Sequence, residues 1–246
     1  MPQNIVRISE IELKGFKNTE YGRIEMPSAY NKIFFPQAAD ILGIYGQNGS
    51  GKTAVIEAME LVQTLLTGQS LSREAVHYIS KNTETCTITV KFIIQTDFKK
   101  AMAEYSFQLK RISNNDLEII HETLSASVWN GEKFESKKTM IDYALHSKGT
   151  IFTPKYRFED LTRSNDENKV NLSIAKKIAQ KDLVSFIFST EGRAVFLSAP
   201  NIISEDYAYI IRLLYQYACI NLFVISNAHA GAISMNFMIP FAFRLD

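Results

Sequence analysis

The chain has 246 residues, of which 46% are hydrophobic and 22% are charged, and its 27 basic and 26 acidic residues leave a net charge of +1. This composition is typical of a folded globular protein and excludes a mainly disordered chain, which would have fewer apolar residues and a higher net charge. The balance of charge also gives no overall electrostatic reason to expect binding to nucleic acid or to a membrane.

Three further features bear on the cellular setting. The two cysteines, Cys86 and Cys219, are too few for a disulfide framework and fit a reducing compartment. The N-terminal residues lack the basic start and the apolar stretch of a signal peptide. No segment has the roughly 18 uninterrupted apolar residues that a membrane span needs. We therefore expect a cytoplasmic protein with no membrane partner.

The first forty residues predict β structure. Apolar Ile11 and Leu13 alternate with charged neighbours in a segment that ends near Phe16, as in a strand with one buried face. A second short strand is expected at 23–26, paired with the first as a hairpin across 17–21.

The pattern then changes to that of a strand followed by a helix. The nearly continuous apolar run at 41–45 predicts a strand that is covered on both faces in a parallel sheet. Residues 53–66 predict an amphipathic helix, because their apolar side chains recur at helical spacing on one side. Thr67-Gly68 supplies its stop.

The remainder divides into a β region and a helical region. From 84 to 140, apolar and polar residues alternate again, which predicts an antiparallel meander with a hairpin turn centred on Asn130-Gly131. From about 155 onward the chain is expected to be mainly helical. A further buried strand is expected at 221–226.

One motif carries chemistry. The residues between the predicted strand and the predicted helix match the Walker A pattern Gly-x-x-x-x-Gly-Lys-Thr, and they are Gly46, Gln47, Asn48, Gly49, Ser50, Gly51, Lys52 and Thr53. Glycines allow successive backbone N–H groups to wrap a polyphosphate closely, and the helix that follows adds the positive end of its dipole. In this pattern the Lys52 ammonium reaches the β- and γ-phosphates, and the Thr53 hydroxyl is a ligand suited to Mg²⁺. The predicted cofactors are therefore ATP and Mg²⁺.

Other nucleotide-binding classes fit less well. A GTPase would need Asn-Lys-x-Asp, but the nearest stretch, 168–171, reads Asn-Lys-Val-Asn and lies in a region that looks loop-like. A protein kinase is excluded because Lys52 follows the glycines directly. A small-molecule kinase of the P-loop class remains an alternative.

The loop sequence Gly-Gln-Asn-Gly-Ser-Gly-Lys-Thr resembles that of the ABC-type ATPases, in the branch that includes SMC, RecF and OLD-like proteins, which are bacterial AAA-type ATPases. Residues 11–18 resemble the N-terminal strand and corner of that branch, which lies near the nucleotide, although Gly15 replaces the usual Asn. The resemblance implies an antiparallel β subdomain after the first helix and ATP-dependent closure of a dimer. It also implies self-association through the nucleotide site and a role in phage defence or DNA transactions.

The predicted fold class is therefore α/β, a P-loop NTPase with a mixed sheet, an antiparallel β-meander subdomain and a helical C-terminal part. We divide the chain into 1–70, with the N-terminal strands, the P-loop and the following helix of the ATPase core, 84–140, the antiparallel β subdomain, and 150–246, a mainly helical region that we expect to be truncated.

The residues for hydrolysis cannot be identified. ABC-type hydrolysis needs an apolar strand ending in Asp-Glu and a signature segment, and the candidate stretches at 92–97, 194–198 and 205–206 do not have this form. We expect these motifs to lie beyond Asp246 in a longer ATPase; the alternative is a nucleotide sensor or scaffold without hydrolysis. Gln95, at the end of a predicted strand, is a candidate for sensing Mg²⁺ and the γ-phosphate. His229 resembles the switch histidine of the family, although an ordinary loop histidine is the preferred interpretation. The effector, protein or nucleic acid, stays open.

Overall fold

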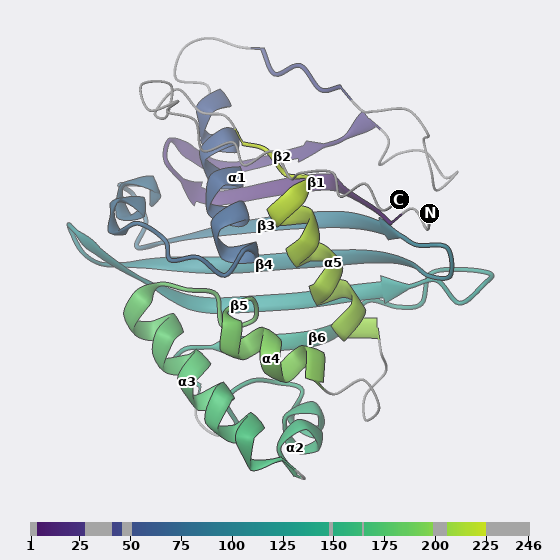
Figure 1. Cartoon of the computed structure of the whole chain (residues 1–246). Helices are drawn as coiled ribbons and strands as arrows, with labels where there is room; N and C mark the ends of the chain where they lie inside the picture. Colours follow the sequence, from purple (N-terminus) through teal and green to yellow (C-terminus); the bar gives the residue numbers. More distant parts are fainter. Residues whose placement is uncertain are drawn as a thin grey trace, which may run out of the picture.

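A six-stranded sheet with helices on one face forms the body of the protein (Figure 1). The computed structural model describes residues 4–27, 41–45, 51–147, 150–163, 165–198 and 206–224. The strands are β1 (Ile5–Phe16), β2 (Thr19–Glu25), β3 (Thr85–Gln95), β4 (Lys100–Ser113), β5 (Asp116–Val128) and β6 (Lys138–Ala144). The helices are α1 (Lys52–Leu66), the 3₁₀-helix η2 (Arg73–Tyr78), α2 (Lys155–Arg163), α3 (Asp166–Asp182), α4 (Thr190–Ser198) and α5 (Asp206–Ile220).

The strand order is β2-β1-β3-β4-β5-β6, and every pair is antiparallel. The predicted α/β class, with its β-meander and its helical C-terminal part, is confirmed, but the sheet of the described residues is antiparallel throughout and not mixed as predicted, because the expected parallel strand at 41–45 is not formed. The strands from both N-terminal and central parts of the chain belong to this one sheet. The division into units at 1–70, 84–140 and 150–246 stays a prediction.

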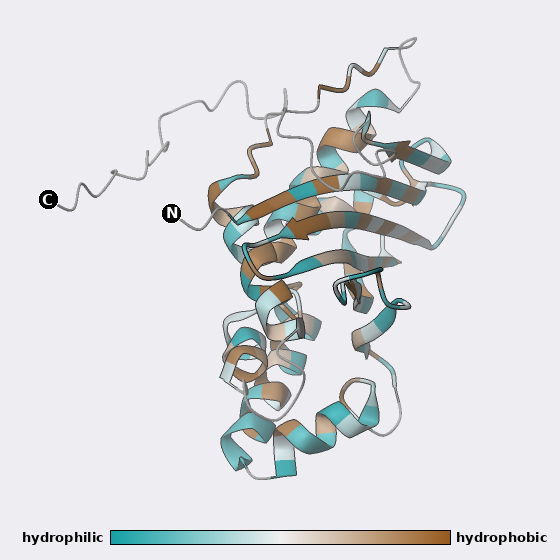
Figure 2. Ribbon diagram, turned by 90° about the vertical axis from the view of Figure 1, so that its right-hand side faces the viewer, coloured by the Kyte–Doolittle hydropathy of each residue, from teal (hydrophilic) through white to brown (hydrophobic). Residues whose placement is uncertain are grey.

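Alternation along the strands separates a covered face from an open one. In β3, the side chains of Ile88, Val90 and Phe92 are fully buried under the helices. The residues between them are polar, and Thr89 on the open face shares a hydrogen bond of 2.8 Å with Ser106 of β4. Figure 2 shows the same alternation as brown and teal bands along the strands. The predicted period of two is confirmed because one face packs against helices and the other faces solvent.

The predicted N-terminal hairpin is confirmed, with a tighter turn than expected. Phe16 pairs with Thr19, so only Lys17 and Asn18 connect β1 to β2. Lys17 has a φ of 52°, in the left-handed region that a two-residue hairpin turn can require.

Two predicted strands are wrong in the residues that the structure describes. Residues 41–45 form no strand, and Ile41 and Tyr45 are 89% and 94% exposed. Residues 221–224 also form no strand, and Phe223 is exposed. An apolar run predicts burial, but a strand also needs neighbours for its backbone groups, and those neighbours are not a property of the run itself.

The turn at Asn130-Gly131 is present but shifted. The N–H of Asn130 donates to the carbonyl of Lys133, so Gly131 and Glu132 are the central residues. The side chain of Asn130 accepts hydrogen bonds from the N–H groups of Glu132 and Lys133, at 3.1 and 2.9 Å. This local side-chain bond sets the turn one residue later than the dipeptide pattern predicts.

The helices agree with the predicted helical segments, with two corrections. The predicted helix at 53–66 is α1, and it ends at Thr67 with Gly68 at a φ of 71°. Residues 168–171, interpreted as loop-like, lie in α3, and the 194–198 stretch lies in a helix, α4.

A fully buried carboxylate joins the sheet to the helical part. Glu122 of β5 accepts hydrogen bonds from the Tyr105 hydroxyl and the Phe186 N–H, both at 2.8 Å, and from the Ser185 hydroxyl. The turn that it holds places Phe186 flat against Tyr143 of β6, with ring centroids 4.2 Å apart. Burial raises the pKa of Glu122, although these donors oppose the shift.

Replacing this carboxylate tests the connection. Glu122→Gln puts an amide NH₂ among donors, so we expect the free energy of unfolding to fall by about 2 kcal/mol at a pH below the pKa of Glu122 in the unfolded chain. Because the pKa is raised in the folded state, the wild-type contribution is fully present below the unfolded pKa and is lost as pH rises through the folded pKa. The difference between wild type and variant should therefore shrink with rising pH in urea unfolding.

Glu118→Gln is the matched control, because Glu118 is a partly exposed carboxylate on the same strand. A pH-independent difference for Glu122→Gln, or an equal response in the control, would contradict the account.

Candidate phosphate-binding site

The structure describes the end of the predicted phosphate loop. Gly51, Lys52 and Thr53 are placed, and α1 begins at Lys52 directly after Gly51. Gly46, Gln47, Asn48, Gly49 and Ser50 lie outside the described residues. The predicted helix therefore starts where the motif requires it.

Gly51 is required by its backbone conformation and by its surroundings. Its φ is 88°, a left-handed conformation that L side chains rarely adopt. A Cβ atom there would lie 2.9 Å from Oγ1 of Thr19, at the start of β2. The last glycine of the loop thus lets the helix start close to the hairpin turn.

The N-terminus of α1 carries no opposing charge of its own. Its first turn contains no acidic residue, and Gly51 supplies no side-chain cap. Lys52 is half-buried and Thr53 is exposed. The partial positive charge of the helix start, together with the Lys52 ammonium, makes this end of α1 suited to an anion.

The first acidic residue of α1 is Glu57, and its charge is balanced by Lys17 in the hairpin turn. The Lys17 ammonium forms an ion pair with the Glu57 carboxylate and lies 4.8 Å from the centroid of the Tyr78 ring. The Lys17 N–H also donates to the Tyr78 carbonyl at 2.7 Å. This contact places the corner at 11–18, predicted to lie near the nucleotide, beside the first turns of α1.

A cavity of about 310 Å³ adjoins the helix start. Its apolar walls include Leu13 and Ile24 from the hairpin and Val55 from α1, and Gly51 and Lys52 also line it. The volume is within the range of small-molecule sites, about 300–1,000 Å³. Sequence reasoning missed this cavity; the alternation in the hairpin marks Leu13 as inward-facing, but the distance from the hairpin to α1 is a tertiary property.

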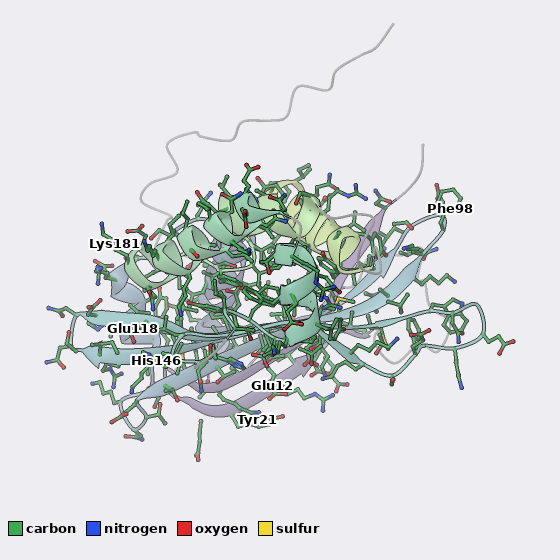
Figure 3. The ribbon with its side chains drawn as sticks, turned by 90° about the horizontal axis from the view of Figure 1, so that it is seen from below. Glu12, Tyr21, Phe98, Glu118, His146 and Lys181 are labelled. Carbon is green, nitrogen blue, oxygen red and sulfur yellow. The ribbon has the colours of Figure 1, made fainter. Side chains whose placement is uncertain are left out.

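The hairpin residues on the other side of the sheet point away from the helices. In Figure 3, Glu12 and Tyr21 lie on the opposite side of the sheet from the helical layer. Tyr21 nevertheless lines the cavity, together with Leu13 and Ile24 from the covered side, so the cavity is not confined to the side that α1 packs against.

The weaker candidates are not brought to this site. Gln95 pairs with Ile5, the first residue of β1. Thr19, which lies against Gly51, pairs with Phe16, the last residue of β1. A strand of this length separates the two ends by about 35 Å, so Gln95 does not sense a phosphate at Gly51. His229 lies outside the described residues.

Within the described part of the chain, no group of three or more His, Cys, Asp or Glu side chains could hold a metal ion. The catalytic residues stay unidentified, because β3 is followed by Asp97 without an adjacent Glu and 194–198 lies in a helix, α4. Across the same described residues, no helix combines the length and the apolar character needed to cross a membrane.

Comparison with known proteins adds the following findings. Residues 10–206 match the model of a family described as AAA domain. No curated protein matches the chain. Among solved structures, the chain is similar to the recombination mediator protein RecF in the RecFOR pathway (RecF-ATPrS), with 16% identity and a TM-score of 0.29. That match covers 88% of this chain and 52% of the RecF chain, so this chain spans about half the length of RecF.

The role of Gly51 can be tested by stability. Gly51→Ala forces an L side chain to a φ of 88° and adds a collision with Thr19, whereas Gly131→Ala places the same side chain at a φ of 103° with nothing within 4 Å. We expect Gly131→Ala to cost about 1–2 kcal/mol of strain and Gly51→Ala to cost more. Adding Thr19→Ala to Gly51→Ala should recover only the part of the stability loss that exceeds the loss in Gly131→Ala. Equal losses in the two glycine variants, measured by denaturant unfolding, would contradict the close approach.

Proposed function

Because the chain belongs to the AAA domain family, whose model matches residues 10–206, we propose that it binds ATP–Mg²⁺ as an ABC/RecF-like ATPase module. The observation that carries the proposal is the start of α1. The helix begins at the Lys52 of a Walker A sequence, directly after a glycine in a left-handed conformation. A helix start of this kind, free of acidic residues, is suited to a polyphosphate.

Each residue of the loop has a proposed role. The backbone N–H groups of Gly46, Gln47, Asn48, Gly49, Ser50 and Gly51 would surround the phosphates. The Lys52 ammonium would contact the β- and γ-phosphate oxygens, and the Thr53 hydroxyl would complete the coordination of Mg²⁺. The exposure of Thr53 in the first turn supports this, since a metal ligand must reach the bound nucleotide.

The cavity beside the loop would take the nucleoside. Its walls include aliphatic side chains from β1, β2 and α1 as well as Tyr21, and Gly51 and Lys52 also line it, so phosphates held at the loop would place the base and ribose near Leu13, Ile24 and Val55. Apolar walls favour the flat face of a base but do not by themselves select adenine.

Nucleotide binding would drive closure of two modules over their nucleotides, in a cytoplasmic system for phage defence or DNA transactions. Closure would be a two-state change that hydrolysis reverses and that moves an attached protein or nucleic-acid partner. This part rests on the resemblance of the loop and the N-terminal corner to the SMC, RecF and OLD-like branch.

A second function is a nucleotide sensor or scaffold without hydrolysis. The observation in its favour is that, in the described ranges, no strand ends in the Asp-Glu pair that activates water. Calorimetric titration with ATP–Mg²⁺ together with a phosphate-release assay separates the two. Binding with turnover supports the ATPase, and binding without turnover supports the sensor.

Removing the Lys52 charge tests the phosphate site. We expect Lys52→Ala to weaken ATP–Mg²⁺ binding by about 100-fold, because a charged hydrogen bond to the phosphates is lost. The far-UV circular dichroism spectrum should not change. In the same titrations, Thr53→Ala should reduce the Mg²⁺ dependence more than the affinity without metal. Wild-type affinity in Lys52→Ala would refute the proposed site.

The nucleoside cavity is tested by comparing ATP with inorganic tripolyphosphate, which has the phosphates alone. We expect Ile24→Ser to weaken ATP binding by about fivefold, since it removes part of the apolar wall. The same variant should leave tripolyphosphate binding unchanged. A parallel loss for both ligands would place the defect in the phosphate loop and would contradict the role of the cavity.

A further inference from the structure

The far end of α1 is bonded to the end of α5. The side-chain amide of Gln63 donates to the carbonyl of Leu222 at 2.6 Å and to the carbonyl of Ala218 at 3.3 Å. Figure 1 shows α5 and α1 on the same face of the sheet. Both hydrogens of the Gln63 amide are therefore used on main-chain carbonyls, one in the last turn of α5 and one two residues after its end.

The Ala218 carbonyl belongs to the last turn of α5, whose carbonyls the helix cannot satisfy by itself, and Leu222 follows the end of the helix. The last four carbonyls of an α-helix have no N–H partner within it. At the end of α5, the N–H groups of Asn221 and Leu222 both turn back to the carbonyl of Tyr217, at 2.8 and 2.9 Å. The last turn of α5 contains no basic residue. Gln63 thus supplies donors that α5 lacks.

The rest of α5 is held by other contacts. The ring of Tyr217 lies edge-on to Phe92 of β3, with centroids 6.1 Å apart. The Arg193 guanidinium of α4 lies 3.7 Å from the centroid of the Tyr215 ring. These contacts fix the body of the helix against the sheet and α4, so the bonding of its final carbonyls depends on the position of α1.

The same helix begins at the phosphate loop. Gly51 and Gln63 are separated by twelve residues, which is about 18 Å along a helix. A helix moves as a rod, so a change at its start displaces its end. The Gln63–Ala218 hydrogen bond is already 3.3 Å long, and a further shift of about 0.5 Å would remove it.

We propose that Gln63 couples nucleotide occupancy of the loop at 46–53 to the end of α5 and to residues 221–224, which follow it. The inference rests on the proposed ATP site and names the part of the chain that responds when nucleotide binds there. A seated nucleotide holds α1 in the position that bonds Ala218 and Leu222, and an empty loop relaxes it. Phe223 lies directly after this end and is 68% exposed, so its position would change with the end of α5.

Hydrogen exchange of the intact chain, with and without ATP–Mg²⁺, measures the coupling. In wild type, nucleotide should slow exchange at the amides of Asn221 and Leu222 by about fivefold, and amides at 51–54 report occupancy. Gln63→Glu keeps the shape but loses both donors and places a carboxylate against carbonyl oxygens. We expect exchange at Asn221 and Leu222 in this variant to be at least as fast as in nucleotide-free wild type, and the response to nucleotide to be abolished.

Two further variants serve as controls. Gln63→Arg keeps donors for the same carbonyls and should restore the response in part. Thr64→Ala changes a hydroxyl that bonds the Glu60 carbonyl within α1, and it should behave as wild type. Because coupling is reciprocal, Gln63→Glu should also weaken ATP binding by about the same fivefold, and Thr64→Ala should not.

The outcomes separate the two proposals. Protection at 51–54 with no change at Asn221 and Leu222 in wild type would leave the ATP site intact and overturn the coupling. A response that persists in Gln63→Glu would overturn Gln63 as its carrier. No protection at 51–54 and no calorimetric binding would overturn the ATP site, and the coupling with it.

Discussion

The buried carboxylate of Glu122 is the contact on which the helical layer depends. An ionisable group in an apolar interior is costly unless donors surround it, and here Tyr105, Ser185 and the Phe186 N–H supply them. The bonds tie a turn more than sixty residues away to β5, the strand next to the edge strand β6. The same turn lies close to the end of α1: a Cβ atom added at Gly68, just after the helix, would lie 2.4 Å from the Phe188 carbonyl oxygen.

The helix that carries Lys52, α1, is therefore held by tertiary contacts at both of its ends. At its start, Gly51 closes on Thr19, and the Lys17–Glu57 ion pair joins the hairpin turn to the first turns of the helix. At its end, the Phe188 turn and the Gln63 amide join it to the helical part. A helix fixed in this way presents the N–H groups of its first turn in one orientation, which would reduce the cost of ordering them around the proposed phosphate ligand. It can also transmit a displacement from one end to the other.

Local chemistry explains which predictions were confirmed. The alternation of Ile88, Val90 and Phe92 marks a strand because side chains on a pleat change face at each residue. The apolar spacing in 53–66 marks a helix for the corresponding reason. The run at 41–45 misled because an apolar composition says nothing about neighbouring strands, and its side chains are exposed in the structure. At Asn130, the side-chain oxygen accepts a hydrogen bond from the Lys133 N–H, and the turn lies one residue later than the Asn-Gly pattern predicts.

The sequence by itself determined where α1 starts and predicted a phosphate loop before it, because a polyphosphate demands glycines, a lysine and a hydroxyl at adjacent positions. Tertiary structure alone decided the cavity between the hairpin and α1, the burial of Glu122 and the bond from Gln63 to Leu222. Each of these brings together residues that are far apart along the chain. Their proximity follows from how the sheet and the helices pack, and no local pattern of residues encodes it.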